Sequence, residues 1–274
     1  MVTRRAESSA LAGRLIAVDT ENFDTLSCCG IKNLMHPGRQ EKRCWLQKNA
    51  KFGLRARVVL GTNGQPNGYI EYVPGEFAWR AVNATGYLFI HCIWTYARQN
   101  QRKGVGSIMV GAVLDEARKA GMHGVAVVVR EGPWMADRRL FLANGFNVAD
   151  SAPPDYELLV SKFDSSSADP AFKKDFARKL SRYKHGLTII RSSQCPHICK
   201  FADEIIETAK NEYHLEPTIV RLKSWRDAQQ APTAYAVFAV IHNGVLLADH
   251  PISRTRFRNI MSKLSEVAAK PAMR

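Results

Sequence analysis

The segment Tyr87–Met122, "YLFIHCIWTYARQNQRKGVGSIMVGAVLDEARKAGM", decides the fold, because it passes from an apolar stretch through a glycine-containing turn into an amphipathic stretch. The apolar and aromatic residues at 87–96 predict a strand near the centre of a sheet. From Gly106 onward, apolar residues recur at intervals of three and four, which predicts a helix that ends at Gly121. Between them lies the turn "QRKGVGS", residues 101–107.

A glycine-rich turn between a strand and a helix is a general anion-binding arrangement. The first N–H groups of a helix have no helical partner, and the helix dipole is positive at that end. Gly104 and Gly106 allow a pyrophosphate to approach the backbone, and Arg102 and Lys103 place positive charge beside it. The dinucleotide fingerprint fails on spacing, because Met109 stands where it requires a third glycine, and the P-loop motif is absent.

The residues around this segment predict an α/β domain with a mixed sheet flanked by helices. Asn and Gly in "NGQPNG", residues 63–68, predict the turn of a hairpin. Strands are expected at 14–19, 54–62, 68–73, 124–130 and 154–163, and helices at 21–26, 38–53 and 135–146.

A polar run of small residues, "DSSSADPAF" at 164–172, predicts a boundary between two domains, residues 1–164 and 165–274. The second domain is expected to be smaller and to fold as a βαβ unit followed by a ββα unit. Its elements are expected at 186–193, 196–213, 217–224, 235–253 and 254–268, of which 235–253 is a hairpin.

The composition is that of a globular protein with a basic surface. Of 274 residues, 46% are hydrophobic, and the formal net charge is +14. Such a surface attracts anions, but no basic stripe interleaved with aromatic residues indicates nucleic-acid binding. No apolar run is long enough for a membrane span, and six irregularly spaced cysteines favour a reducing compartment. We therefore expect a cytoplasmic protein without a metal site.

The turn and its neighbours resemble the general control non-repressible 5-related N-acetyltransferases, the GNAT family. The phosphate loop of that family has the pattern Gln/Arg-x-x-Gly-x-Gly/Ala, which Gln101–Gly106 matches. The segment "RRLFLANGF", 138–146, stands where the family has a Leu-Tyr-x-x-x-Gly-Phe helix, and the resemblance spans about residues 12–163.

Longer strings resemble the YoaP-like subgroup, whose members add a C-terminal thioredoxin-like domain. These strings are "CCGIKN" (28–33), "GYIEYVPGEFAWRAVNATGY" (68–87), "IHCIW" (90–94), "GMHGVAVVV" (121–129), "EGPWM" (131–135) and "APPDYELL" (152–159).

This resemblance implies that acetyl-coenzyme A is the co-substrate and lies where the strands 87–96 and 124–130 diverge. Backbone groups near Trp94 would pair with the pantetheine and polarise the thioester, and amides of the loop would bind the pyrophosphate. The implied cofactor-binding residues are Trp94, Thr95, Tyr96, Gln101, Arg102, Lys103, Gly104, Val105, Gly106 and Ser107.

The implied reaction is direct attack of a neutral amine on the thioester, in which a base or a water relay takes the proton. Candidate bases are Glu71, Glu76 and Glu131. Alternatively, Glu71 lies on the solvent face of its strand, and Glu131 caps a helix or pairs with an arginine. His91 is expected to be a core histidine. Phe141 stands where the family has a tyrosine that protonates the departing thiolate, which leaves the group serving this step open.

Trp79 and Arg80 are candidate substrate-binding residues in a connection between strands. Residues of these types stack on a ligand or clamp its carboxylate. The alternative is a loop anchored by a buried tryptophan.

Cys195 precedes Pro196 at the expected start of a helix, in the motif "CPHIC". A helix N-terminus pushes a thiol toward thiolate, and this placement resembles the active turn of thioredoxin-like proteins, with Ala231-Pro232 as a candidate cis bond. Cys199 lies one position beyond the Cys-x-x-Cys spacing of thiol exchange. Cys195 is therefore a candidate catalytic residue, and a structural or substrate-recruiting domain is the alternative.

Three functions follow from these features. The main hypothesis is an acetyl-coenzyme A-dependent N-acetyltransferase that acts on an amine of a small molecule or peptide. The second is an acyl-coenzyme A-binding sensor whose C-terminal domain responds to thiol or metal state. The third is a thiol oxidoreductase with a redox pair at Cys195 and Cys199.

Overall fold

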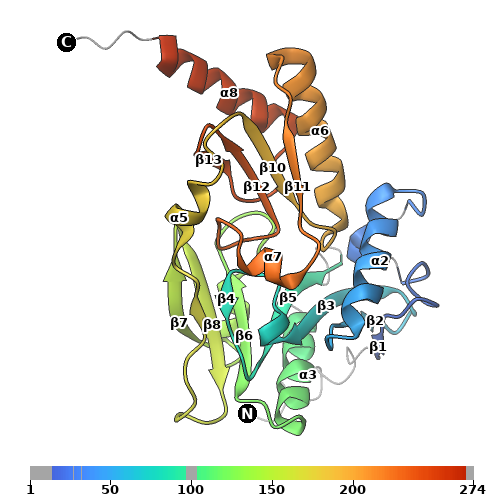
Figure 1. Ribbon diagram of the computed structural model, residues 1–274. Helices are drawn as coiled ribbons and strands as arrows, with labels where there is room; N and C mark the ends of the chain where they lie inside the picture. The colour runs from blue at the N-terminus through green and yellow to red at the C-terminus, as the bar shows by residue number, and fades with distance from the viewer. Residues whose placement is uncertain (1–13, 27, 32, 97–103, 270–274) are drawn as a thin grey trace.

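The computed structural model describes residues 14–26, 28–31, 33–96 and 104–269, which form two units. Figure 1 shows the first unit below and the second above it, with α2 of the first unit next to α6 of the second. The first unit has a seven-stranded mixed sheet in the order β1-β2-β3-β5-β6-β8-β7. Its strands are β1 (Leu15–Ala17), β2 (Arg55–Leu60), β3 (Pro66–Pro74), β5 (Tyr87–Thr95), β6 (Gly124–Val129), β7 (Asn147–Ala152) and β8 (Tyr156–Lys162).

Helices cover this sheet, as the sequence predicts. They are the short η1 (Cys28–Gly30) and η2 (Gly75–Phe77), and the α-helices α2 (Pro37–Ala50), α3 (Val105–Lys119) and α4 (Arg138–Leu142). The predicted hairpin is confirmed as β2 and β3, and β5 is the central strand, antiparallel to β3 and parallel to β6.

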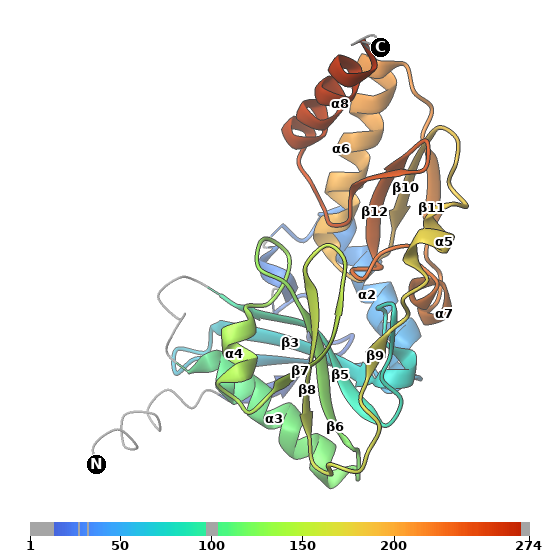
Figure 2. The same cartoon turned by 90° about the vertical axis from the view of Figure 1, so that its left-hand side faces the viewer.

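The two faces of the sheet belong to two different cores. Because successive residues of a strand point to opposite faces, Val125, Val127 and Val129 of β6 pack with the apolar side of α3. Ala126 and Val128 belong to a second core, which extends into the second unit. Figure 2 shows α3 and α4 along one side of the sheet and the second unit beyond the other end of it. The second unit is therefore packed on the first through a shared core.

The second unit has a four-stranded sheet in the order β11-β10-β12-β13, in which β10 and β11 are parallel and the other pairs antiparallel. This agrees with the predicted βαβ unit followed by ββα, and the relation to thioredoxin-like domains stays a prediction. The expected cis bond at Ala231-Pro232 is wrong, because the cis bond of the described chain joins Pro153 and Pro154. The elements are β10 (Leu187–Arg191), α6 (Pro196–Tyr213), β11 (Thr218–Arg221), α7 (Trp225–Gln229), β12 (Phe238–His242), β13 (Val245–Ala248) and α8 (Arg254–Ala269).

The connection between the units remains attached to the first unit beyond residue 164. β9 (Ala171–Phe172) pairs with β4 (Val82–Asn83), and the Phe172 N–H donates to the Asp150 carboxylate at 2.9 Å. The short helix α5 (Phe176–Leu180) then leads to the second sheet. The domain division after residue 164 stays a prediction.

Several elements differ from the expectations, among them the short helices α5 and α7, which were not expected. Residues 21–26 form turns instead of a helix, because the Asp19 carboxylate accepts the N–H groups of Glu21 and Asn22, each at 2.9 Å. The edge strand β7 was not expected, since its sequence "NVADSA" has little apolar alternation. Among the described residues, no helix is both long and apolar enough to cross a membrane.

Candidate active site

The central feature of the first unit is a gap between two parallel strands. β5 and β6 pair only over Tyr87–Ile90 and Gly124–Val127, although β5 continues to Thr95. A cavity of about 400 Å³ lies where they diverge. Its walls come from the ends of both strands, from α2, and from the second unit, so residues far apart in the sequence build one site.

A bulge in β5 turns His91 toward the interior of the molecule. Glu71 pairs with Cys92 and Tyr72 with Ile90, which leaves His91 unpaired in the register between β3 and β5. Its Nε2 accepts the backbone N–H of Trp79 at 2.8 Å. Burial lowers the pKa of His91 to about 4, so the ring is neutral at pH 7. The expectation of a core histidine agrees with these contacts.

Glu71 is fully buried and does not lie on a solvent face. Its carboxylate forms an ion pair with Lys42 of α2 and accepts hydrogen bonds from the Tyr69 hydroxyl at 2.7 Å and from the Gln194 side chain at 3.2 Å. Burial alone raises the pKa of Glu71, but the charge of Lys42 and the nearby ring of His91, whose Nδ1 lies 3.5 Å from the carboxylate, outweigh it and bring the pKa to about 2. Such a carboxylate is a weak base at neutral pH.

The loop before α6 brings the second unit into this network. The Lys42 ammonium donates to the backbone carbonyl of Gln194 at 2.6 Å, and Arg80 donates to the side-chain oxygen of Gln194 at 2.7 Å. Gln194, Cys195 and Tyr235 line the cavity beside Lys42 and Arg80. The second unit therefore forms one wall of the site.

Cys195 lines the cavity, but the expected thiolate character is wrong. Burial raises the pKa of the Cys195 thiol, and the N–H groups of His197 and Ile198 at the start of α6 offset this only in part. Burial likewise raises the pKa of Cys199, whose thiol lies 3.7 Å from a Glu41 carboxylate oxygen. Both cysteines are free thiols, and the described residues contain no cluster that would bind a metal ion.

The residues expected to bind the cofactor lie at the end of β5 and the start of α3. Trp94 is half exposed and lines the cavity, whereas the Tyr96 N–H donates to the Asn67 carbonyl at 2.9 Å. Gly104 precedes α3 with a φ of 81°, a conformation that favours glycine. Val105, Gly106 and Ser107 form the first turn of α3, and Gln101, Arg102 and Lys103 lie outside the described residues.

The two candidate substrate-binding residues take different positions. Arg80 is buried and lines the cavity. Trp79 belongs to the core, where its ring packs against Trp45 at 5.2 Å and its indole N–H donates to Asn49 at 3.1 Å. Trp79 therefore anchors the connection that carries Arg80.

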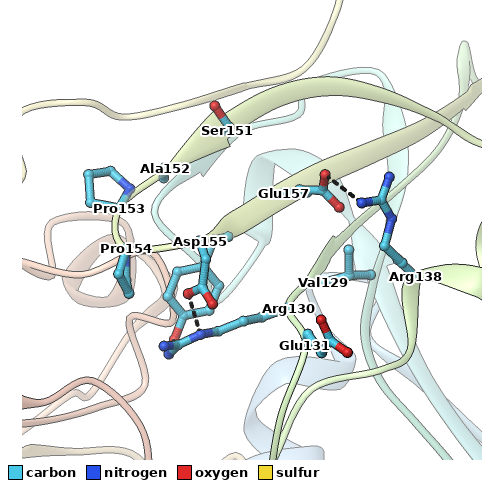
Figure 3. A pocket seen from close by; sticks show the side chains of 11 residues that line it. Val129, Arg130, Glu131, Arg138, Ser151, Ala152, Pro153, Pro154, Asp155 and Glu157 are labelled. Atoms are coloured by element: carbon cyan, nitrogen blue, oxygen red, sulfur yellow. Dashed lines mark hydrogen bonds and ion pairs between the residues drawn. The ribbon is translucent and has the colours of Figure 1, made fainter.

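Glu131 lines a separate depression of about 590 Å³ between the end of β6 and the β7–β8 hairpin. Figure 3 shows Arg138 paired there with Glu157, and Arg130 with Asp155, while Glu131 points into the opening. Glu76 lies in η2 outside both sites. The structure thus brings neither of these two candidate bases to the cavity between β5 and β6.

Sequence reasoning did not find Lys42, Gln194 or Tyr235. A lysine in a polar helix is normally solvated, and a glutamine or tyrosine 99 or more positions after β5 carries no local signal of its partner. The "CPHIC" motif, however, pointed to the segment that carries Gln194 and Cys195. Phe141, noted for its missing hydroxyl, is fully buried and packs against Phe146 at 5.3 Å.

Comparison with known proteins gives one match over most of the chain and others over its first unit. Residues 22–146 match the model of the acetyltransferase (GNAT) family. The uncharacterized N-acetyltransferase YoaP of Bacillus subtilis (strain 168) is 25% identical over 255 residues, which cover 91% of this chain and 99% of YoaP.

Two similar solved structures cover the first unit. One is yncA of Salmonella typhimurium with its cofactor acetyl-CoA, at 18% identity and a TM-score of 0.43, over 58% of this chain and 98% of that chain. The other is the phosphinothricin acetyltransferase Pat of Sinorhizobium meliloti in complex with AcCoA, at 13% identity and a TM-score of 0.44, over 58% and 94% of the two chains. The match to the acetyltransferase (GNAT) family model thus covers residues 22–146, which lie within the first unit.

Proposed function

We propose that this protein transfers the acetyl group of acetyl-coenzyme A to the amine of a small molecule or peptide. The observation that carries the proposal is the divergence of β5 from β6 beyond Ile90, with a cavity beside the free edge of β5. The match of residues 22–146 to the GNAT family model and the similarity to the N-acetyltransferase YoaP support the same reaction.

The edge of β5 that faces β6 offers backbone groups to the pantetheine chain. The other edge is occupied by β3, where Trp94 pairs with Tyr69 and Thr95 with Gly68. Backbone groups at Trp94 and Thr95 are therefore assigned to the pantetheine and to the thioester carbonyl. The Tyr96 N–H already donates to the Asn67 carbonyl, so this N–H is not assigned to the cofactor.

The start of α3 is assigned to the pyrophosphate. The Ile108 N–H donates to the Gly104 carbonyl at 3.0 Å and closes the first helical turn. The amides of Val105, Gly106 and Ser107 come before it and have no acceptor within the helix. Together with the positive end of the helix dipole, they form a binding site for phosphate oxygens.

The attacking amine reacts in its neutral form. Lys42 of the cavity wall is balanced by Glu71, so the wall adds a net positive charge only through Arg80. The N-terminal α-amino group of a peptide has a pKa of about 7.7–8.0 in water, so a substantial part of it is neutral at pH 7.5. The attack then needs only water to accept the proton, which agrees with the weak basicity of Glu71.

Tyr235 is assigned the return of a proton to the coenzyme A thiolate. Burial raises the pKa of Tyr235 well above its ordinary range, so the hydroxyl remains protonated at neutral pH. It lines the cavity, whereas position 141 holds a buried phenylalanine. Cys195 also keeps its proton and stands on the same wall, where it is the second candidate for this step.

The test measures calorimetric binding of acetyl-coenzyme A to variants at the two ends of α3. Gly104 and Gly121 both have positive φ values and both face open space, so a side chain strains the backbone equally at either end. Gly104→Glu adds a negative charge at the phosphate site and is expected to raise the Kd at least tenfold. Gly104→Ala and Gly121→Glu control for strain and charge, and equal Kd values for all three variants contradict the proposal.

An activity assay on the same protein distinguishes the proposed enzyme from the alternative function, an acyl-coenzyme A sensor. A sensor is the second candidate because Phe141 cannot protonate a thiolate and Glu71 is a weak base. Coenzyme A formation that depends on an added amine indicates transfer. Tight binding without amine-dependent turnover across a broad amine panel indicates a sensor.

A further inference from the structure

Arg80 is a buried cation whose hydrogen-bond acceptors are all neutral groups. Its side chain is 4% exposed, and it donates to the carbonyl oxygens of Trp79 at 2.8 Å and His91 at 3.2 Å and to the side-chain oxygen of Gln194 at 2.7 Å. None of the described carboxylates forms an ion pair with Arg80. A buried charge without a counter-charge is costly, so this site is prepared for an anion.

The other buried arginines of the described chain do not share this property. Arg39 forms an ion pair with Asp24, and Arg191 forms one with Glu41. Of the three, Arg80 alone lines the cavity between β5 and β6. Among these three buried arginines, the one without an ion pair is therefore the one that a ligand in the cavity would contact.

The surrounding charges leave the wall with a net positive charge. Lys42 is balanced by Glu71, and His91 is neutral because burial lowers its pKa to about 4. Three hydrogen bonds use three of the five N–H donors of the Arg80 guanidinium, so donors remain for a ligand. The Tyr235 ring lies 5.1 Å from the guanidinium and keeps its plane in place.

We infer that Arg80 binds a carboxylate of the acetyl acceptor, and that the acceptor is a free amino acid with an apolar side chain. This inference rests on the proposed function, because it names the substrate of that site. A planar guanidinium matches the two oxygens of a carboxylate. The amine to be acetylated then lies on the side of the cavity toward the diverging strands.

The rest of the cavity selects the size and polarity of this amino acid. About 400 Å³ lies at the small-molecule end of ligand cavities. Ile90, Val127, Met135 and Trp134 line it and favour an apolar side chain. The wall contributed by the second unit leaves Arg80 buried inside the molecule. A free amino acid therefore reaches Arg80 more easily than a segment of a folded protein does.

The experiment compares acetylation of amino acids with that of the same molecules lacking the carboxylate. Phenylalanine is paired with phenethylamine, leucine with 3-methylbutylamine, and methionine with 3-(methylthio)propylamine, and the acetylated products are quantified by mass spectrometry. The full chain is used as wild type, Arg80→Gln, Arg80→Lys and the control Arg138→Gln, whose arginine lies at the separate depression. Calorimetric binding of each amino acid in the presence of coenzyme A is measured on the same proteins.

Wild type is expected to favour at least one amino acid over its decarboxylated partner in kcat/KM. Arg80→Gln is expected to lower kcat/KM for the amino acid about tenfold to a hundredfold, because a charge-assisted hydrogen bond is lost. The kcat/KM for the decarboxylated amine is expected to change less than threefold. Arg80→Lys is expected to recover part of the loss, and Arg138→Gln to match wild type.

The inference is overturned if the decarboxylated amines are acetylated as well as the amino acids, or if Arg80→Gln lowers both alike while it still binds acetyl-coenzyme A. It is also overturned if wild type shows neither acetylation nor saturable binding of any of these amino acids. Failure of the proposed function looks different, since acetyl-coenzyme A itself then does not bind. A thermal unfolding scan and retained acetyl-coenzyme A binding show that each variant is folded.

Discussion

Tyr235 is proposed to return a proton to the coenzyme A thiolate, a step that Phe141 cannot serve because it has no hydroxyl group. Phe141 is buried beneath α3, whereas Tyr235 reaches the cavity from a segment nearly a hundred residues later. Tyr235→Phe is expected to lower kcat about a hundredfold and leave the Kd for acetyl-coenzyme A within twofold. Steady-state kinetics and calorimetry measure the two quantities, with Tyr213→Phe on α6 as control. An unchanged kcat would transfer the role to Cys195.

Glu71 and His91 are expected to make the free energy of unfolding depend on pH in the acidic range. The folded pKa of Glu71 is about 2, below its ordinary 4.5, so the stability it contributes is present above pH 4.5 and is lost as the pH falls toward 2. His91 has a folded pKa of about 4, below its ordinary 6.5, so the unfolded chain takes up this proton first and stability falls between pH 6.5 and 4. Thermal unfolding of wild type is therefore expected at progressively lower temperature from about pH 6.5 downward.

A charge-removing substitution separates the two contributions. Glu71→Gln removes the negative charge that balances the buried Lys42 ammonium and is expected to lower the free energy of unfolding by about 3–5 kcal/mol at pH 7. The same variant loses the pH dependence below 4.5 that is due to Glu71, whereas the dependence due to burial of His91 remains and extends to lower pH, because the Glu71 carboxylate raises the pKa of His91 in the folded chain. The double variant Lys42→Met, Glu71→Gln is expected to regain part of the stability. A Glu71→Gln protein as stable as wild type would contradict the ion pair.

At the scale of elements, α2 and α6 approach each other at Gly38. A Cβ at this position would lie 1.9 Å from the Pro196 carbonyl oxygen, a backbone atom that cannot turn aside. Gly38→Ala is therefore expected to separate the helices and to lower the free energy of unfolding by about 1–3 kcal/mol. Gly111→Ala on α3 meets nothing within 4 Å and is expected to stabilise by about 0.5–1 kcal/mol. Urea unfolding measures both, and equal effects would argue against the contact.

Most elements could be predicted from the sequence because their signals are local. The hairpin of β2 and β3, the central β5 and the helix α3 follow from turn residues, apolar runs and helical spacing. β7 escaped prediction because an edge strand needs few apolar residues. The segment 21–26 was taken as helical although Asp19 offers its N–H groups a competing acceptor.

At the scale of the whole molecule, the site depends on contacts that no local pattern encodes. The sequence pointed to Arg80 and Cys195 separately, through their residue types and their neighbours. Their presence in one cavity follows from packing of the second unit, where Gln194 bonds to Arg80, Glu71 and Lys42 at separations of more than a hundred residues. The acid–base roles of buried groups could not be predicted either, because they depend on burial that only the folded chain defines.

The shared core predicts that the two units unfold together. The second core joins Trp45, Phe89 and Val128 of the first unit to Ile198 and Phe238 of the second, so separation of the units would expose apolar surface on both. Calorimetry is expected to show one transition with equal calorimetric and van't Hoff enthalpies. Two resolved transitions would show that the units are independent.

Binding of acetyl-coenzyme A provides a second test of whether the two units unfold together, because a ligand stabilises only the cooperative unit that binds it. At a hundred times its Kd, the cofactor is expected to add about 2.7 kcal/mol to the free energy of unfolding. If the two units unfold as one, acetyl-coenzyme A raises the unfolding temperature equally at both of two fluorescent probes, Trp79 in the first unit and Trp225 in the second. Each probe is isolated by replacing the other tryptophans with phenylalanine. If only the probe in the first unit shifts, the second unit is attached to the site without being part of it, and the wall formed by Gln194, Cys195 and Tyr235 opens without unfolding the acetyltransferase.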